Sequence, residues 1–299
     1  MDVVVNSDCR MTLTTQSLIQ GKSHYYLNMF QCLGYPDNAP PIADWLRLYH
    51  GLEGQWLVVT PVYWHATHND AMLMACDQHL NCTDEEARAL FDVFTLFATS
   101  QGMRTYFHDS FTWLLQCDGQ PLITASPPHA LLHHSIFPHL KSLDSTFFWQ
   151  RFLTEVQMLL GSRSGGKTSI NGVWIWGGGA LGSPSNRTIL VHTQRQYDMA
   201  KLLSNRVSYF LDPLKITDVF RDQEICISSD CKKQSHKAAA KIDKNVLFLY
   251  DSIESDEMAL LSNRFKESNV NWFWNNVAYH TLRPSWFSRM ISFILKKVS

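Results

Sequence analysis

The sequence predicts an α/β fold, a mixed sheet with helices on its faces, together with an amphipathic helix at the C-terminus. Strand, helix and strand patterns alternate over 188–193, 197–204 and 207–211, which is typical of a sheet with parallel members. The wholly apolar stretch 246–250 predicts a strand buried on both faces. An amphipathic helix pattern at 84–101 supplies an apolar face that can cover such a sheet.

The composition indicates a globular chain with a substantial core. Of its 299 residues, 45% are hydrophobic and 18% are charged, and the formal net charge is -1. That charge gives no general reason to expect binding to nucleic acid. The odd number of cysteines, without close CxxC pairs, favours free thiols in a reducing compartment. No signal peptide is evident and no stretch reaches the ~20 apolar residues of a membrane-spanning helix, so we expect a cytoplasmic protein.

We expect three segments along the chain. Residues 1–41 should be irregular, because proline and glycine punctuate 34–41. A single α/β domain should cover 42–283, with a sub-boundary near 161–169 as an alternative, and the amphipathic helix should occupy 284–299.

The first part of that domain should contain a helix and two strands. The helix is expected at about 42–49 and a strand at 55–64. Because proline lacks a backbone donor, Pro61 should place this strand at a sheet edge or mark a bulge. The stretch 71–76 should be its antiparallel neighbour.

The helix at 84–101 has recognisable ends. Thr83 and Glu86 form a capping box before its first turn, and Gly102 can stop it.

A second long helix is expected at about 145–160, after a strand at 111–117 and a proline-rich loop over 118–141. Its Glu155 aligns with the apolar stripe. A buried carboxylate needs a partner, so Glu155 would be either a structural hydrogen-bond anchor or an acid of a site.

The stretch 170–179 combines a strand with three glycines. Its β-branched and aromatic residues favour a packed strand, and the glycines allow close approach of the backbone to a ligand. Ligands bind beyond the carboxyl ends of strands in α/β proteins. The candidate ligand-binding residues are Asn171, Trp174, Trp176, Gly177, Gly178 and Gly179. A tight turn packed under two tryptophans is the structural alternative.

Two fragments imitate a nucleotide-binding site. Residues 161–168 fit the GxxxxGK[ST] pattern, with Lys167 and Thr168 at its end, and Asp251 follows the apolar strand 246–250 as a magnesium-binding aspartate would. A phosphate loop needs a strand before it and a helix after it. Here a helix pattern precedes the motif and poor helix formers follow it, so we expect the match to be accidental.

The closest group of metal-ligand residue types is His65, His68 and Asp70. On a loop, their imidazoles and carboxylate could converge on a divalent metal. On a strand, His65 and His68 would point to opposite faces. A turn with surface histidines is therefore the favoured alternative.

Two basic segments are candidates for contact with a ligand or a membrane. Lysines at 233, 237, 241 and 244 give a short helix one basic face, which could meet a phosphate-bearing ligand but is usually solvated. The C-terminal helix, 285–297, could lie on an anionic membrane surface or dock on the protein's own core. We favour docking, because an apolar helical stripe ordinarily faces a core.

Three pieces of the chain stand in a recognisable order: Trp64 with Asn69 and Asp70, then Glu155–Leu160 (EVQMLL), then Asn171–Gly179 (NGVWIWGGG). In this order they resemble a group of bacterial proteins catalogued as cofactor-independent phosphoglycerate-mutase-like members of the alkaline phosphatase superfamily, also labelled RpfE-type regulatory proteins. The resemblance runs from about 42 to about 252, with a weaker echo at 283–287.

That resemblance implies phosphoryl transfer by a serine or threonine nucleophile beside two metal ions held by aspartates and histidines. The group often has Asp-Pro-Val-His where this chain has Thr60-Pro61-Val62-Tyr63, so a carboxylate and an imidazole are missing. We therefore interpret the chain as a regulatory or degenerate member without a complete two-metal site.

Two alternatives remain, a divalent-metal-dependent phosphoryl-transfer enzyme and a nucleotide binder. For the enzyme, the candidate catalytic residues are His68, Asp70, Glu155 and Asp251, and the candidate metal ligands are His65, His68 and Asp70.

Overall fold

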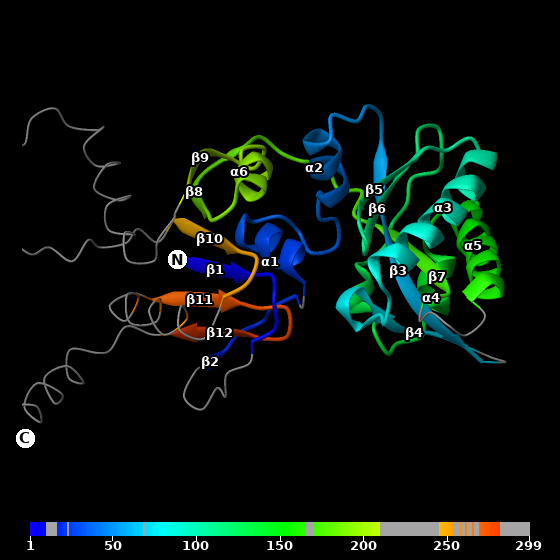
Figure 1. Ribbon diagram of the computed structural model, residues 1–299, viewed down its shortest axis with the longest axis horizontal. Helices are drawn as coiled ribbons and strands as arrows, with labels where there is room; N and C mark the ends of the chain where they lie inside the picture. The colour runs from blue at the N-terminus through cyan, green and yellow to red at the C-terminus, as the bar shows by residue number, and fades with distance from the viewer. Residues whose placement is uncertain are drawn as a thin grey trace, which may run out of the picture. The chain divides into compact units, whose positions relative to one another are not determined.

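The computed structural model describes residues 1–9, 17–22, 24–67, 70–164, 170–209, 245–253 and 269–281, together with 258, 261 and 265. The chain forms two compact units, one made of Met1–Leu33 and Ser183–Ser299, the other of Gly34–Gly182 (Figure 1). Several predictions lie outside the described residues, namely those for His68, Lys167, Thr168, the lysines of 233–244 and the helix at 285–297.

The division into units differs from the single domain expected over 42–283. The first unit combines the N-terminal segment with strands that follow Gly182, because the first strand of the chain lies between two of those later strands. The residues from Gly34 to Gly182 are therefore inserted between two parts of one sheet.

The first unit is built on a seven-stranded sheet with the order β2-β12-β11-β1-β10-β8-β9. The strands from β11 to β9 are all parallel, and β12 and β2 extend the sheet in antiparallel pairing, so the sheet is mixed as predicted. The elements of this unit are β1 (Asp2–Val5), β2 (Ser17–Leu18), α1 (Tyr25–Cys32), β8 (Ser185–Val191), α6 (Gln194–Ala200), β9 (Ser204–Tyr209), β10 (Val246–Tyr250), β11 (Val270–Phe273) and β12 (Ala278–Thr281).

Strand β1 lies in the middle of this sheet, so the prediction of an irregular segment over 1–41 is wrong there and at α1. The strand pairs in parallel with β10 on one side and with β11 on the other. Val3, Val4 and Val5 are all fully buried. A strand covered on both faces shows a continuous apolar run without alternation, and four residues at a terminus give that signal too briefly to be recognised.

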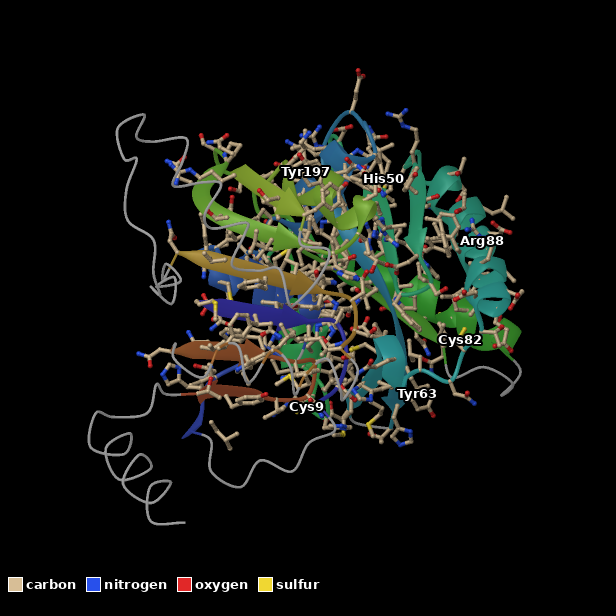
Figure 2. All side chains as sticks on the ribbon, turned by 60° about the vertical axis from the view of Figure 1, so that its left-hand side comes forward. Cys9, His50, Tyr63, Cys82, Arg88 and Tyr197 are labelled. Atoms are coloured by element: carbon tan, nitrogen blue, oxygen red, sulfur yellow. The ribbon has the colours of Figure 1, made fainter. Side chains whose placement is uncertain are left out.

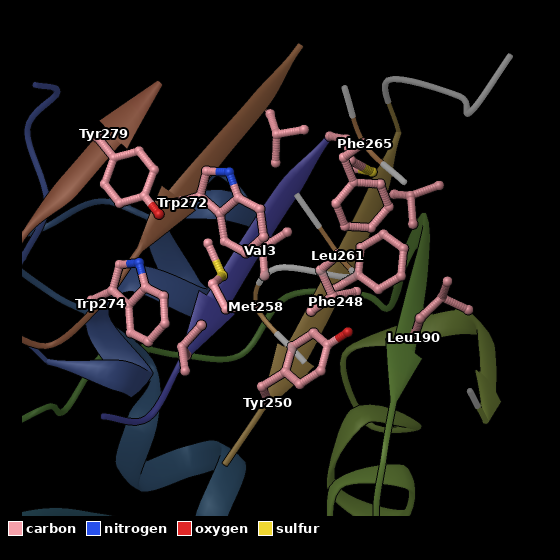
Figure 3. Close-up of a cluster of buried hydrophobic side chains, with 14 residues drawn as sticks. Val3, Leu190, Phe248, Tyr250, Met258, Leu261, Phe265, Trp272, Trp274 and Tyr279 are labelled. Atoms are coloured by element: carbon pink, nitrogen blue, oxygen red, sulfur yellow. The ribbon is translucent and has the colours of Figure 1, made fainter. Parts of the chain in front are cut away.

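A buried cluster on this sheet includes Phe248, Trp272 and Tyr279 (Figure 3). Met258, Leu261 and Phe265 pack in the same cluster and are helical. Their spacing brings all three to one helical face. Apolar packing therefore joins these residues to β10, β11 and β12.

The second unit contains a five-stranded antiparallel sheet, in which β3 pairs with three other strands. One of these is β4, which confirms the neighbour predicted at 71–76. The strands are β3 (Trp56–Ala66), β4 (Ala71–Cys76), β5 (Thr105–Asp109), β6 (Thr112–Gln116) and β7 (Gly172–Trp176).

Strand β3 is an interior strand, because β6 and β7 pair with overlapping parts of it and must flank it on opposite edges. Of the two alternatives predicted for Pro61, the sheet edge is therefore wrong, and the register shift in the pairing of β3 with β4 lies at Tyr63 and Trp64, close to Pro61 but not at it. The carbonyl of Val62 points to the β7 side, where it accepts the N–H of Asn171 at 3.2 Å, so the nitrogen of Pro61 points to the other edge. On that edge pairing with β6 ends at Val59 and pairing with β4 begins at Val62, and the missing donor falls in the gap.

Helices α2 (Ile42–Tyr49) and α3 (Asp84–Ser100) agree with the predicted positions. At the start of α3, Thr83 Oγ1 accepts the Glu86 N–H at 3.2 Å and a Glu86 carboxylate oxygen accepts the Thr83 N–H at 2.9 Å. The helix ends before Gly102, which has a φ of 77°. Both end signals are confirmed.

Helix α5 (Phe148–Ser164) begins three residues later than predicted. The Asp144 carboxylate accepts the N–H of Phe148 at 3.2 Å and the N–H of Trp149 at 2.9 Å, so it caps the first turn from outside the helix. Phe147, at a φ of 58°, belongs to the turn that precedes the helix. The loop before it contains the short helices η2 (Pro128–Ala130) and α4 (Phe137–Lys141), and η1 (Asp77–His79) follows β4.

Candidate functional site

The two tryptophans of β7 are core residues. Trp174 and Trp176 are buried, and each indole finds a partner within the second unit. The Nε1 of Trp174 donates to the carbonyl of Ser126 at 2.9 Å, and the Nε1 of Trp176 donates to Thr60 Oγ1 at 2.8 Å. These bonds satisfy the polar end of each ring, which a buried tryptophan needs.

Asn171 extends the pairing of β3 with β7. Its Oδ1 accepts the Trp64 N–H and its Nδ2 donates to the Trp64 carbonyl, both at 2.7 Å. The side-chain amide thus completes the backbone hydrogen bonding of Trp64 beyond the end of β7, which is a structural role.

The three glycines after β7 pack against β3, α2 and the segment before α2. The Gly177 carbonyl accepts the N–H of Ala43 at 3.2 Å, in the first turn of α2. Gly177 has a φ of 74°, and a Cβ there would lie 2.9 Å from a methyl of Val58. At Gly179 a Cβ would overlap the carbonyl oxygen of Ala39. Close packing within the unit therefore disfavours a side chain at Gly177 and Gly179.

His65 and Asp70 flank the hairpin between β3 and β4. The Thr67 N–H donates to the Asp70 carbonyl at 2.7 Å, and the Asp70 N–H donates to Thr67 Oγ1 at 3.1 Å. The Asp70 Oδ1 accepts the hydroxyl of Ser135 at 2.6 Å and the N–H of Ala71 at 2.7 Å. Asp70 is thus used to hold the hairpin, and His65 is exposed on β3.

Glu155 is exposed on α5, so the alignment with the apolar stripe is wrong for this residue. The neighbouring positions Phe152, Leu153 and Val156 are buried instead. Helix α5 continues through Gly161 to Ser164, which confirms that a helix, and not a strand, precedes the phosphate-loop pattern.

Polar side chains gather in the first unit where the parallel strands β8 and β10 end. These two strands are neighbours, but the chain continues from β8 to β9 on one side and from β10 to β11 on the other. Such a topological switch point is where α/β sheets bind ligands. Asp251 follows β10 and is exposed there, whereas His192 follows β8. Asp251, one of the predicted site residues that the structure describes, thus follows a strand at this switch point.

Gln196 joins the two strand ends. Its Nε2 donates to Oδ1 of Asp251 at 3.0 Å. Its Oε1 accepts the N–H of His192 at 2.9 Å and that of Thr193 at 3.3 Å. The Gln196 N–H in turn donates to Thr193 Oγ1 at 3.2 Å, which completes a capping box at the start of α6. The amide group is therefore fixed in direction, with its donor end toward Asp251.

Tyr25 of α1 completes this polar group. It is buried, and its side chain is hydrogen-bonded to Gln196. Burial, and after it the charge of Asp251, raises the pKa of Tyr25 well above the usual value for a phenol. The group therefore consists of a neutral phenol, an amide and a carboxylate, which can bind a polar ligand by hydrogen bonds.

The residues at these strand ends do not fit a two-metal centre. A centre of that kind holds its ions roughly 3.5–4 Å apart and needs several carboxylates and imidazoles. Within the described part of the first unit, no three histidine, cysteine, aspartate or glutamate side chains bring ligand atoms within 4.8 Å of one another. We therefore derive no reaction step through a metal.

Gln196 and Tyr25 are absent from the residues predicted from sequence. The pattern Thr193-x-x-Gln196 is a readable capping-box signal that locates the start of α6, but it does not reveal that the same amide reaches Asp251. Tyr25 carries no local signal, because its helix is brought to β8 and β10 only by the tertiary fold.

No protein-family model and no curated protein matches the chain. Among solved structures, the chain is similar to the cofactor-independent phosphoglycerate mutase from Thermoplasma acidophilum DSM 1728, at 12% identity and a TM-score of 0.35, over 90% of this chain and 80% of that chain. A TM-score this low assigns neither a fold nor an activity. Of the helices in the described residues, none is long and apolar enough to cross a membrane.

Proposed function

We propose that this chain is a cytoplasmic regulatory member of the group it resembles in sequence, the RpfE-type, phosphoglycerate-mutase-like proteins. In this proposal it acts by binding a polar ligand at the ends of β8 and β10, and it lacks a complete two-metal site. The sequence resemblance supports the group, and the missing Asp and His at Thr60 and Tyr63 support the loss of metal ligands.

The observation that carries the proposal is the hydrogen bond between Gln196 and Asp251. A carboxylate that ligates a divalent ion presents its oxygens to the metal and is neighboured by further anionic or imidazole ligands. Here the neighbour of Asp251 is a neutral amide, held in place by the N–H groups of His192 and Thr193. Such a pair is better suited to recognise a hydrogen-bonding ligand than to hold an ion.

Metal content tests the proposal directly. The purified full-length chain, equilibrated with Mn²⁺ and Zn²⁺ and then dialysed, should contain less than one ion per chain by inductively coupled plasma mass spectrometry. An Asp251→Asn variant should have the same content. Two tightly held divalent ions per chain, lost in Asp251→Asn, would overturn the proposal.

The alternative is a metal-dependent phosphoryl-transfer enzyme, which the sequence resemblance also allows. It predicts interconversion of phosphoglycerate isomers in the presence of Mn²⁺, and a turnover that depends on Asp251. The non-catalytic proposal predicts no conversion above that of a boiled sample. Turnover in the wild type that is lost in Asp251→Asn would favour the enzyme.

A further inference from the structure

A hydrogen-bonded series of four titratable side chains lies in the second unit and includes none of the residues selected from the sequence. His50 Nε2 and His108 Nδ1 are 2.7 Å apart, and the hydroxyl of Tyr106 lies 3.0 Å from His50 Nδ1. At the far end, His108 Nε2 lies 3.6 Å from Oδ2 of Asp109. The order is therefore Tyr106, His50, His108, Asp109, and each imidazole uses one nitrogen toward the other imidazole.

The backbone aims both histidines at each other. The pairing of β5 with β6 shifts register between Phe107 and Asp109, so His108 lies in a β-bulge. A bulge redirects a side chain, and bulges are common beside active sites. His50 is the residue that ends α2, at a φ of -90° and a ψ of 0°, in the sparsely populated bridge region. Figure 2 labels His50.

The negative charge of Asp109 sets the direction of the hydrogen bonds between His108, His50 and Tyr106. The side chain of His108 is only 1% exposed and faces a carboxylate that is 38% exposed, so its Nε2 should carry a hydrogen toward Asp109. A neutral His108 then accepts at Nδ1 from His50 Nε2–H. His50 in turn accepts at Nδ1 from the hydroxyl of Tyr106. Each hydrogen shared along this series of four side chains thus points from Tyr106 toward Asp109.

The neighbouring elements contribute one aromatic ring and charged side chains that have partners of their own. On α2, Tyr49 packs edge-on against His50, with ring centroids 4.8 Å apart. The nearby Arg47 and Asp44 pair with each other at 2.8 Å. On α3, Asp84 accepts the hydroxyl of Ser110 at 2.5 Å. Asp109 is the carboxylate that lies beside the second imidazole, that of His108.

We propose that Tyr106 is a base-assisted nucleophile and a site of covalent modification by phosphoryl electrophiles. A hydroxyl, a base within hydrogen-bond reach and a group that orients the base are the components that activate serine and cysteine nucleophiles. In the step, the Tyr106 oxygen forms a bond to phosphorus, and the bond from phosphorus to the leaving group breaks with its electron pair. The phenolic proton passes to His50 Nδ1, and the proton on His50 Nε2 passes to His108, which becomes an imidazolium beside Asp109.

An alkyl fluorophosphonate is a suitable probe, because it phosphonylates an activated hydroxyl and releases fluoride. Peptide mass spectrometry on the full-length protein gives the labelling rate of each tyrosine. Tyr63 is the internal reference, since it is 37% exposed on β3. We expect Tyr106 to react about 100-fold faster than Tyr63, which is within the usual range for base catalysis.

A His50→Gln variant should bring the labelling rate of Tyr106 down to that of Tyr63, without changing Tyr63 itself. The rate at Tyr106 should level off with rising pH once both imidazoles are neutral, because neutral His50 is the base. The rate at Tyr63 should continue to rise with pH. A relay that serves only to pack the two elements together would change the melting temperature in the variant but not this pH profile.

Equal rates at Tyr106 and Tyr63 in the wild type would overturn the proposal, as would an unchanged rate at Tyr106 in a folded His50→Gln variant. If His50→Gln does not fold, Asp109→Asn decides, because that side chain is partly exposed and asparagine can still accept the Phe111 N–H that Asp109 Oδ1 accepts at 3.0 Å. We expect a smaller drop in rate for Asp109→Asn, and no drop would count against the relay. The proposal does not depend on the function proposed for the first unit.

Discussion

Gly179 lies so close to the backbone of Ala39 that a Cβ at position 179 would overlap the Ala39 carbonyl oxygen. The same Cβ would lie 2.8 Å from the Ala39 carbonyl carbon. At Gly178, in contrast, the nearest atom to a Cβ is the end of the Leu57 side chain, at 2.8 Å. Two adjacent glycines thus face obstacles of different stiffness, a backbone and a movable methyl group.

Substitution should separate the two positions. Gly179→Ala should lower the free energy of unfolding by about 1–3 kcal/mol, the range for overpacking, because the backbone at Ala39 must move. Gly178→Ala is the matched control and should cost less than about 1 kcal/mol, since the Leu57 side chain can rotate away. Urea unfolding measures both. Equal losses would show that the turn is not packed on Ala39 in solution.

Asp144 should contribute to stability as a helix cap. Asp144→Ala should cost about 1 kcal/mol at neutral pH, because the N–H groups of Phe148 and Trp149 lose their acceptor. Glu155→Ala, on the exposed face of the same helix, should stay within about 0.5 kcal/mol of the wild type. Chemical denaturation of both variants checks this, and a loss at Glu155 as large as at Asp144 would contradict the assigned cap.

The contribution of Asp144 should depend on pH. Burial acts to raise its pKa, but hydrogen bonds from the Thr146 hydroxyl and from the N–H groups of Trp149, Thr146 and Phe148 outweigh it and leave the pKa below the usual range. An aspartate with a lowered pKa stabilises the fold above its unfolded value, about 3.9, and loses that effect as the pH falls through the folded value. The difference in the free energy of unfolding between wild type and Asp144→Ala should therefore be largest above about pH 5 and should become smaller below about pH 4. A difference that is unchanged at pH 3 would exclude a charged cap.

Gln196 should be needed to position Asp251. Gln196→Ala removes the acceptor for the N–H groups of His192 and Thr193 and the donor to Asp251, so we expect a loss of about 1–3 kcal/mol in the free energy of unfolding. Gln194→Ala is the control on the exposed face of α6 and should change stability by less than about 0.5 kcal/mol. Equal effects of the two changes would indicate that the Gln196 amide does not make these hydrogen bonds in solution.

Local signals in the sequence predict many elements, while relationships across the sheet escape them. The apolar run ending at Tyr250 and the capping box of Thr83 and Glu86 are encoded by adjacent residues, and the structure has both. Position in the sheet is a different matter. Pro61 suggests an edge, but β3 tolerates it in the interior because two partner strands on one side leave a gap at that residue.

The candidate site residues also divide into those with a local signal in the sequence and those brought together only by the tertiary fold. Asp251 could be selected because a carboxylate after a buried strand is a local feature. Its partners Gln196 and Tyr25 come from other elements, and contact between them depends on the order of strands in the sheet. His50 and His108 are likewise separated in sequence, and the bulge that directs His108 leaves no mark that can be read in advance.

A second network, at the amino ends of the parallel strands, should matter for stability. Arg187 of β8 pairs with Asp2 of β1, and its guanidinium also donates to the Val246 carbonyl at 3.2 Å. Asn271 donates to the other oxygen of Asp2 at 2.6 Å. The side chains of Arg187 and Asp2 are 13% and 14% exposed, so their charges are largely removed from water.

Arg187→Met should cost about 3–5 kcal/mol, because it leaves the Asp2 carboxylate buried without its cation. The double change Arg187→Met with Asp2→Asn should recover part of that loss, since no uncompensated charge remains. Denaturant unfolding of the single and double variants gives the comparison. If Asp2→Asn lowers the free energy of unfolding as much in the Arg187→Met variant as it does in the wild type, the two side chains do not form the pair.

All the described cysteines are free thiols, as the odd count predicts: Cys9, Cys32, Cys76, Cys82 and Cys117. Two of them allow a test by reactivity. Burial, and after it the carboxylates of Glu86 and Asp84, raises the pKa of Cys82 to about 11. Burial, and after it Asp118, raises the pKa of Cys117 to about 11.

An ordinary thiol ionises near 8.5, so at pH 8 the reactive thiolate should be reduced on the order of 100-fold at both Cys82 and Cys117. Iodoacetamide followed by peptide mass spectrometry should show slow labelling at pH 8 and a rise of about tenfold per pH unit up to pH 10. The same thiols in urea should react at the ordinary rate. Since these acids hold their protons more tightly when folded, their contribution to stability is complete below about pH 8.5 and declines as the pH rises toward 11. Fast labelling of Cys82 and Cys117 at pH 8 in the folded protein would show that neither thiol is shielded as the fold requires.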